Sequence, residues 1–228
     1  MANTTGKVFK GTSTWYEDAD KYWKTVPSSV DGMLGGLQVV HEPDVRDSSL
    51  FLTKLQSKHT LRKNYACDCG AGIGRVSKHF LLRQFNKVDL VEQNGEFLQA
   101  AAEYLQSEQS EGRVGDMFDV GLQAFTPMQA RYDVIWCQWV LSHLTDDDLV
   151  AFFKRCTTGL APGGFICVKE NVAGSSYVVD SEDSSVTRSA TVFESLFQKA
   201  GLSVIEKQTQ TDFPDGLFEV KMWALQPK

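Results

Sequence analysis

The feature that most constrains this chain is a glycine-rich turn between an apolar strand and a helix. Residues 66–74 read ACDCGAGIG, and their surroundings predict a strand over 64–69 and a helix over 75–83. Glycine lets the backbone turn tightly and lets a flat or charged ligand approach the main chain. The pattern therefore predicts an α/β sheet with a ligand pocket that opens at residues 68–74.

The rest of the chain continues the alternation of strands and helices. Amphipathic spacing predicts helices at 96–106, 146–158 and 191–200, and apolar runs predict strands at 87–92, 114–119, 132–139, 165–169, 202–207 and 217–225. Upstream, aromatic residues at helical spacing predict a helix over 15–23, and Asp47 or Ser48 is placed to cap another helix. The polar segment 174–189 is expected to form a mobile loop or lid.

The expected domain organisation is simple. Residues 1–14 are polar and without period, which predicts a flexible tail. Residues 15–228 are expected to form a single domain, in which a helical N-terminal extension (15–60) precedes a Rossmann-like core (61–228).

Composition argues against several classes of partner. Of 228 residues, 42% are hydrophobic and 23% are charged, which is ordinary for a globule with one sizeable core. The formal charge of −6 argues against nucleic acid, because affinity for nucleic acid depends on neutralising phosphates. Apolar runs stay well short of the roughly 20 residues that span a bilayer, so no membrane partner is expected.

The five cysteines are expected to be reduced and to serve as packing residues. Most lie in or beside apolar runs, where a free thiol behaves as a small hydrophobe. Cys67 and Cys69 are too close in sequence for the usual zinc spacing, so no metal site is predicted. The N-terminus also shows no signal-peptide pattern, and the expected compartment is a reducing one.

Three residues around the glycine turn indicate which cofactor it suits. A dinucleotide fingerprint has glycine or alanine at its third key position, where this chain has Arg75. Asp68 would repel a pyrophosphate, whereas S-adenosyl-L-methionine (AdoMet) has no phosphate and carries a sulfonium and an amino group. Glu92, 24 residues later, can accept hydrogen bonds from the ribose hydroxyls of either cofactor. These residues favour AdoMet, with S-adenosyl-L-homocysteine as product.

The predicted fold class is therefore the class I AdoMet-dependent methyltransferase fold. This is a Rossmann-like α/β fold with a mostly parallel sheet and an antiparallel final strand. Ligands of such sheets bind beyond the carboxyl ends of the strands, which places Gln138, Trp139 and His143 near the site. Residues 121–123 follow the third strand and suit contacts with an adenine ring, and Arg75 could pair with the cofactor carboxylate.

Several further short motifs are distributed along the chain. The most specific are VDGMLGG at 30–36 and DSSV at 183–186. The others are YWK at 22–24, DCGAGIGR at 68–75, GLQ at 121–123, FTP at 125–127, YDVIW at 132–136, QWV at 138–140, HLTD at 143–146, KEN at 169–171 and Arg188. With these motifs, spread over about residues 22–225, the chain resembles the protein N-terminal methyltransferases, which methylate the α-amino group of proteins beginning X-Pro-Lys or X-Pro-Arg.

The resemblance implies roles for individual residues. It assigns AdoMet binding to Trp23, Gly70, Arg75, Glu92, Gln93, Leu122, Gln123 and Gln138. It assigns the peptide channel to Leu34, Gly35, Trp139, Asn171, Asp180 and Ser185, with Trp23 and Asp183 also bordering it. His143 and Asp183 become the candidate general bases. The implied partners are protein substrates, bound through exposed N-terminal tails after removal of the initiator Met, and the implied compartments are cytoplasm and nucleus.

The chain departs from the family pattern at two places. Glu92 stands where the family often has Asp, which keeps the carboxylate on a longer arm. Leu217 and Phe218 stand where an aliphatic residue followed by tyrosine is usual, so any hydroxyl contact there is lost.

Other interpretations remain open from the residues alone. His143 could be a structural hydrogen-bonding residue, Asp180 and Asp183 could be solvated loop residues, and Trp23 and Trp139 could be core residues. The fold would equally allow a methyltransferase of a small-molecule amine or hydroxyl. A nicotinamide-dependent oxidoreductase and a non-catalytic AdoMet-binding subunit are the further alternatives.

Overall fold

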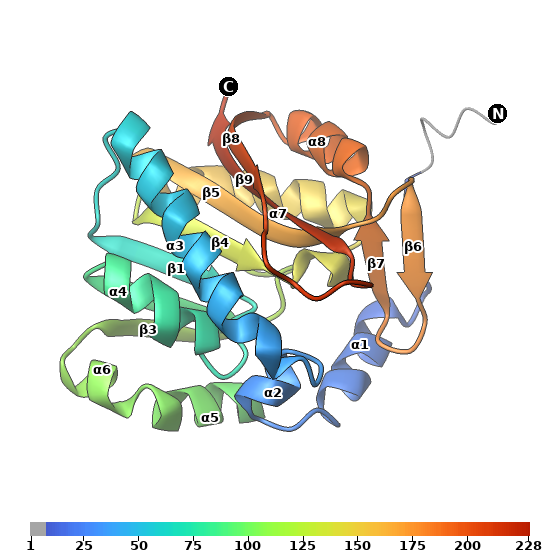
Figure 1. Ribbon diagram of the computed structural model, residues 1–228, viewed down its shortest axis with the longest axis horizontal. Helices are drawn as coiled ribbons and strands as arrows, with labels where there is room; N and C mark the ends of the chain where they lie inside the picture. Colours follow the sequence, from blue (N-terminus) through green and yellow to red (C-terminus); the bar gives the residue numbers. More distant parts are fainter. Residues whose placement is uncertain (1–7) are drawn as a thin grey trace.

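A seven-stranded sheet with the order β3-β2-β1-β4-β5-β9-β8 forms the centre of the computed structural model, which describes residues 8–228 (Figure 1). Neighbouring strands from β3 to β5 run parallel, whereas β9 is antiparallel to both β5 and β8. The predicted sheet, mostly parallel with an antiparallel final strand, is confirmed. Its strands are β1 (Tyr65–Cys69), β2 (Lys87–Glu92), β3 (Val114–Asp119), β4 (Tyr132–Gln138), β5 (Leu160–Val172), β8 (Leu202–Thr209) and β9 (Glu219–Pro227).

The strand order reverses at β1, which pairs with β2 on one side and β4 on the other. Connections that leave the two sides of such a point diverge and open a crevice at the carboxyl edge of the sheet. The glycine-rich turn follows β1 directly, so the topology places it at this crevice.

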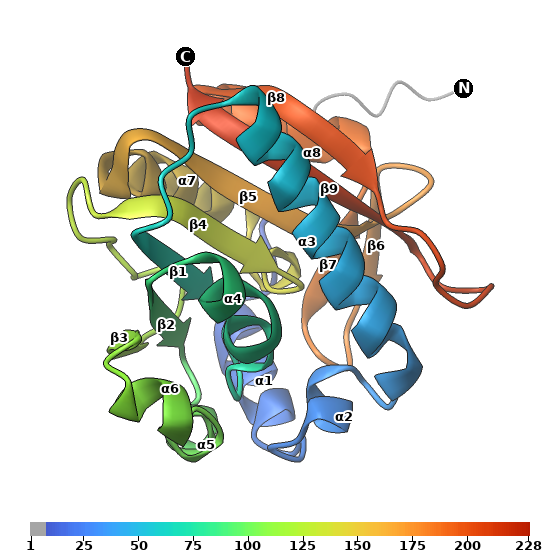
Figure 2. The same cartoon turned by 60° about the vertical axis from the view of Figure 1, so that its left-hand side comes forward.

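Helices cover both faces of the sheet, and side chains alternate between the two layers. On β4, Ile135 and Cys137 face the layer of α7 (Asp146–Gly159) and α8 (Ala190–Lys199). Trp136 faces the other layer, to which α3 (His41–Lys58), α4 (Leu82–Gln84) and α5 (Gly95–Tyr104) contribute apolar side chains (Figure 2). A short α6 (Gln106–Ser110) follows α5. Because β4 is buried on both faces, its centre, Val134–Cys137, is a continuous apolar run.

The N-terminal extension packs beside the carboxyl end of β4. It consists of α1 (Trp15–Trp23), α2 (Val30–Met33), the 3₁₀ turn η1 (Gln38–Val40) and α3. Acidic residues in the first turn of α1 and Lys21 in its last turn complement the helix dipole. The indole Nε1 of Trp15 donates to the carbonyl of His143 over 2.7 Å, so α1 is anchored to the 3₁₀ turn η3 (Leu141–His143). Figure 1 shows α1 below the hairpin of β6 (Tyr177–Asp180) and β7 (Ser185–Arg188).

Part of the segment expected as a flexible tail lies within the described residues. The Phe9 N–H donates to Oδ2 of Asp146 over 2.9 Å, and the Phe9 carbonyl accepts from the Asp146 N–H over 3.0 Å. The Phe9 ring also meets Trp15 edge to face at 4.9 Å. Phe9 is therefore held against the protein, while residues 1–7 lie outside the described residues.

Three local expectations were wrong. Helix α3 begins at His41, so Asp47 and Ser48 lie inside it, and Asp47 accepts hydrogen bonds from Thr211. Strand β5 begins at Leu160, five residues before the expected start, and a register irregularity in its pairing with β4 accommodates the early residues. The segment expected as a loop or lid contains a hairpin instead, formed by β6 (Tyr177–Asp180) and β7 (Ser185–Arg188).

Arg188 explains why that polar segment is ordered. Its guanidinium is fully buried, pairs with Oδ1 of Asp146 at 2.9 Å, and donates to the carbonyls of Leu141 and Leu144. These bonds attach the hairpin to the turn that carries His143. The sequence pattern of a polar run gives no sign of such tertiary partners.

Replacing Arg188 with Met should destabilise the fold by about 3 kcal/mol, because it leaves the buried Asp146 carboxylate without its cation. The free energy of unfolding is measured in urea. Lys21→Met is the control, since Lys21 pairs with Asp18 on the surface with side chain exposures of 71% and 41%, and it should cost about 1 kcal/mol or less. Equal losses for both variants would contradict the anchoring role of Arg188.

Candidate active site

A cleft opens at the carboxyl ends of the parallel strands. Its wall is built from the segments that follow β1, β2, β3 and β4, together with side chains from the N-terminal extension. The residues that line it are Tyr16, Ala19, Trp23, Met33, Gly70, Ala71, Gly72, Arg75, Val76, Val91, Glu92, Gln93, Phe97, Val120, Gly121, Leu122, Gln123, Gln138, Trp139, Val140, His143 and Leu144.

The glycine turn forms the floor of this first cleft. Gly70 has a φ of 73°, and a Cβ placed on it would lie 2.4 Å from the side chain of Val140. The N–H groups of Gly70 and Ala71 both donate to the carbonyl of Val91, at 2.8 and 3.0 Å. Only glycine combines this backbone conformation with so close an approach. The sequence pattern was therefore a sound indicator of the turn.

Glu92 ties the glycine turn to the end of β2. Its Oε2 accepts from the Gly72 N–H and its Oε1 from the Asn94 N–H, both at 2.9 Å. Burial raises the pKa of the carboxyl, and these backbone donors oppose the rise. Each carboxylate oxygen keeps a further lone pair, so Glu92 can still accept a ligand hydroxyl.

Arg75 is the cation of the cleft. Its side chain is buried, and Nη1 lies 2.8 Å from Oδ2 of Asp44. The guanidinium carbon also sits 5.6 Å from the centre of the Trp139 ring. Within residues 8–228, its Nε and Nη2 have no hydrogen-bond partner, so the remaining donors are available to an anionic group in the cleft.

The segment after β3 is held by a residue that the sequence analysis did not identify. Arg155 on α7 donates to the carbonyls of Leu122, Gln123 and Phe125 over 2.7–3.1 Å. Leu122 and Gln123 thereby keep their places in the wall of the cleft. Nothing in the local sequence around Arg155 indicates this contact, since its partners lie about 30 residues upstream.

A second cleft adjoins the first. Four residues line both clefts, namely Trp23, Met33, Trp139 and His143. The remaining lining residues come from the N-terminal extension, η3, β5, the β6–β7 hairpin, α8, β9 and the segment before β9. They are Leu34, Gly35, Leu37, Val40, Ser142, Glu170, Asn171, Asp183, Ser185, Val186, Thr187, Phe193, Phe213, Leu217, Phe218 and Val220.

His143, between the two clefts, has both ring nitrogens engaged. Nε2 accepts from the indole Nε1–H of Trp23 over 3.0 Å, because tryptophan can only donate. Nδ1 lies 3.1 Å from the carbonyl of Ser184 and must therefore be the protonated nitrogen of a neutral ring. Burial lowers the pKa of His143, which favours this neutral form.

Two buried polar atoms at the second cleft lack a partner within the described residues. They are Oδ1 of Asp183 and Nε1 of Trp139. Trp139 also has a φ of 52°, a left-handed conformation that costs on the order of 1–3 kcal/mol for a bulky residue. Unsatisfied groups and strain of this kind concentrate where a ligand binds.

Glu170 supports the turn that carries these residues. Its Oε1 accepts from the N–H groups of Val140 and Leu141, at 2.8 and 2.7 Å. Burial raises the pKa of its carboxyl to about 7. In the sequence Glu170 stands only within the KEN motif, and no local pattern indicates this supporting role.

The structure brings nearly all of the predicted site residues together. Every predicted cofactor residue lines the first cleft, and the predicted peptide residues Leu34, Gly35, Trp139, Asn171 and Ser185 line the second. Asp180 is the exception, because its side chain is exposed at the end of β6 and lines neither cleft. The individual binding and catalytic roles stay predictions.

The first cleft fits AdoMet in its chemistry. Arg75 offers free donors for a carboxylate, Glu92 offers acceptors for ribose hydroxyls, and Leu122 and its neighbours offer apolar walls for an adenine ring. The lining carries no cluster suited to pyrophosphate, and the Asp68 carboxylate lies buried under the turn with Ser77 as its donor at 2.7 Å. Fold and cleft together define a class I AdoMet-dependent methyltransferase.

Comparison with known proteins narrows the class. The model of the family described as AdoMet-dependent proline dimethyltransferase matches residues 11–226. An alpha N-terminal protein methyltransferase 1 from Drosophila melanogaster is 48% identical over 97% of this chain and 79% of its own length. An N-terminal Xaa-Pro-Lys N-methyltransferase 1 from Xenopus tropicalis is 46% identical over 96% of this chain and 98% of its own.

A solved structure supports the same conclusion. The SAM-dependent methyltransferase from Leishmania major has a TM-score of 0.87 and 38% identity, over 93% of this chain and 83% of that one. This chain belongs to the AdoMet-dependent proline dimethyltransferase family, and its cofactor is AdoMet.

Gly70→Ala should lower AdoMet affinity by at least about 10-fold, because the added methyl group must displace either Val140 or the turn. Isothermal titration calorimetry measures the dissociation constant. Gly112→Ala is the control, since Gly112 has a similar φ of 72° and open space around its Cβ position. That variant should lose only about 1 kcal/mol of stability. Unchanged AdoMet affinity in Gly70→Ala would contradict the role of the turn.

Proposed function

We propose that this protein methylates the free α-amino group of proteins that begin X-Pro-Lys or X-Pro-Arg. The observation that carries the proposal is the meeting of two clefts at Trp23, Met33, Trp139 and His143. The first cleft suits AdoMet, and the second, bordered by the hairpin and the N-terminal extension, would receive the end of a peptide. The names of the curated relatives support this acceptor.

The nucleophile of the reaction must be a neutral amine. An α-amino group has a pKa near 7.7–8.0, so a substantial fraction of it is neutral at cellular pH. AdoMet, when bound, supplies an electrophilic methyl group on its sulfonium. The main task of the protein is then to hold the amine aligned at about 3–3.5 Å from the reacting carbon. Removal of the remaining ammonium proton needs only a modest base.

Asp183 is the better placed of the two candidate bases. Its Oδ1 is buried at the second cleft and has no partner among the described residues, so it can accept a proton or a hydrogen bond from the substrate ammonium. The lone pair on Nε2 of His143 already accepts a hydrogen bond from the Trp23 indole. His143 then serves to position Trp23 and the Ser184 carbonyl, and it can accept a proton only after Trp23 releases Nε2.

Recognition of the first residues of the substrate rests on shape and charge. A proline at position two has no N–H, so it would be recognised by contact with flat rings. Trp139 and Phe213, whose ring centres lie 6.3 Å apart, offer such surfaces. We place Asp180 at the outer end of this channel, opposite Ser185 in the hairpin, where it would attract the Lys or Arg at position three. Its exposure makes that contribution a small one.

The proposal is tested by mass spectrometry on a short Ser-Pro-Lys-Arg peptide incubated with the protein and AdoMet. Methyl groups should be added only to the free amine, because an N-terminal amide has no nucleophilic lone pair. The same peptide acetylated at its N-terminus is the control. If neither peptide gains a methyl group while AdoMet binding is measurable, the acceptor is a different molecule and the proposal is wrong.

Asp183→Asn should lower kcat by about 10²–10⁴-fold, because the amide keeps the shape of the side chain but cannot take a proton. AdoMet affinity should stay nearly unchanged, since Asp183 lines only the second cleft. Steady-state kinetics on the Ser-Pro-Lys-Arg peptide measure kcat, and Glu182→Gln, one residue away and exposed, is the matched control. Wild-type turnover in Asp183→Asn would remove Asp183 from the mechanism.

A further inference from the structure

We infer that Asp44 on α3 is a positioning residue that orients the cofactor-binding side chains Arg75 and Gln138. The inference rests on the proposed role of these two residues in AdoMet binding. Asp44 does not line the first cleft itself. Asp44 lies directly behind the first cleft. One oxygen of its carboxylate contacts Arg75 and the other contacts Gln138, and both of these side chains line the cleft.

The geometry of these contacts is specific. Oδ2 of Asp44 lies 2.8 Å from Nη1 of Arg75, and Oδ1 accepts from Nε2 of Gln138 over 2.7 Å. Gln138 is fixed from its other end, because its Oε1 accepts from the Trp136 indole over 2.9 Å. Nη1 of Arg75 also lies 3.2 Å from Nδ1 of His41, and the guanidinium packs over the Trp139 ring. Because the guanidinium is a rigid plane, these contacts together restrict the directions in which its Nε and Nη2 can point. Asp44 therefore determines where the free donors of Arg75 lie.

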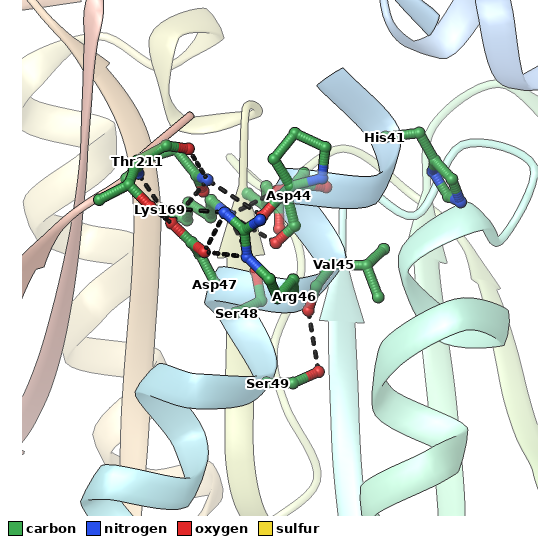
Figure 3. Close-up of polar contacts among 12 residues, drawn as sticks. His41, Asp44, Val45, Arg46, Asp47, Ser48, Ser49, Lys169 and Thr211 are labelled. Atoms are coloured by element: carbon green, nitrogen blue, oxygen red, sulfur yellow. Dashed lines mark hydrogen bonds and ion pairs between the residues drawn. The ribbon is translucent and has the colours of Figure 1, made fainter. Parts of the chain in front are cut away.

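The charges of the cluster point to an anionic ligand. Asp44 is paired with two buried cations, since Lys169 donates to its Oδ1 at 2.5 Å as well as to its carbonyl and to Ser48 (Figure 3). Burial alone would raise the pKa of Asp44, but Lys169 and Arg75 outweigh burial and lower it, so the carboxylate stays ionised. A second buried carboxylate, that of Asp68, also interacts electrostatically with Arg75, although burial raises its pKa to about 6. The free donors of Arg75 remain for a ligand carboxylate in the first cleft.

A neighbouring residue on the same helix provides a natural control. Asp47 is one turn further along α3 and as buried as Asp44, and Figure 3 shows it beside Arg46 and Thr211. Its partners are Arg46, Thr211 and Gln210, none of which lines the first cleft. A substitution at Asp47 therefore removes a buried carboxylate from α3 without touching the side chains that face the cofactor.

The experiment compares two ligands in three proteins. Binding of S-adenosylhomocysteine and of 5′-methylthioadenosine, which lacks the amino acid moiety, is measured by calorimetry in wild type, Asp44→Asn and Asp47→Asn. Loss of the charged partner of Arg75 should weaken S-adenosylhomocysteine by about 10- to 100-fold, the usual worth of a charge-assisted hydrogen bond. Binding of 5′-methylthioadenosine should change by less than about 3-fold. Both ligands should bind Asp47→Asn as they bind wild type.

Several outcomes would overturn the inference. Unchanged S-adenosylhomocysteine affinity in Asp44→Asn would show that Arg75 is placed without it. Equal losses for both ligands would indicate general damage to the cleft. If Asp44→Asn does not fold, the double variant Asp44→Asn with Lys169→Met keeps the net charge of the cluster and is measured instead. Failure of the wild type to bind S-adenosylhomocysteine would contradict the cofactor assignment of the first cleft, which is a separate result.

Discussion

The parallel pairing of β1 with both β2 and β4 is the constraint on which the rest of the site depends. It brings the ends of strands from distant parts of the sequence to one edge of the sheet, where Gly70, Glu92 and Gln138 face a common cleft. The glycine turn then allows the main chain to approach a ligand, and the Glu92 carboxylate holds the Gly72 N–H in place. Without this arrangement these side chains would not face the same cleft.

The N-terminal extension turns this general scaffold into a site with two compartments. Trp23 and Met33 come from α1 and α2, and they complete the boundary between the first and the second cleft. The Trp23 indole also determines the protonation state of His143 by donating to Nε2. The buried Asp44 carboxylate on α3 attaches the same extension to Arg75 and Lys169. Placement of the extension is thus linked electrostatically to the cofactor cleft.

The sequence allowed prediction of those features that have a local cause. The glycine turn, strands β2 and β3 and helix α1 were predicted at their observed positions, because backbone conformation and apolar period are encoded in neighbouring residues. The start of α3 and the β6–β7 hairpin were not predictable in this way. Asp47 looked like a helix cap but bonds to Thr211, and Arg188 orders a polar run through Asp146. Both partners are far away in the sequence.

The sequence by itself determined the fold class and the residue types of the cofactor cleft, since the glycine turn with Asp68, Arg75 and Glu92 favours AdoMet through local features, and its longer motifs indicated the family. Only the tertiary structure decided how these groups are used. It excluded Asp180 from the wall of the acceptor cleft, left Oδ1 of Asp183 without a partner, and engaged both nitrogens of His143. Each of these facts depends on burial and on hydrogen bonds between segments more than 40 residues apart, which no local pattern records.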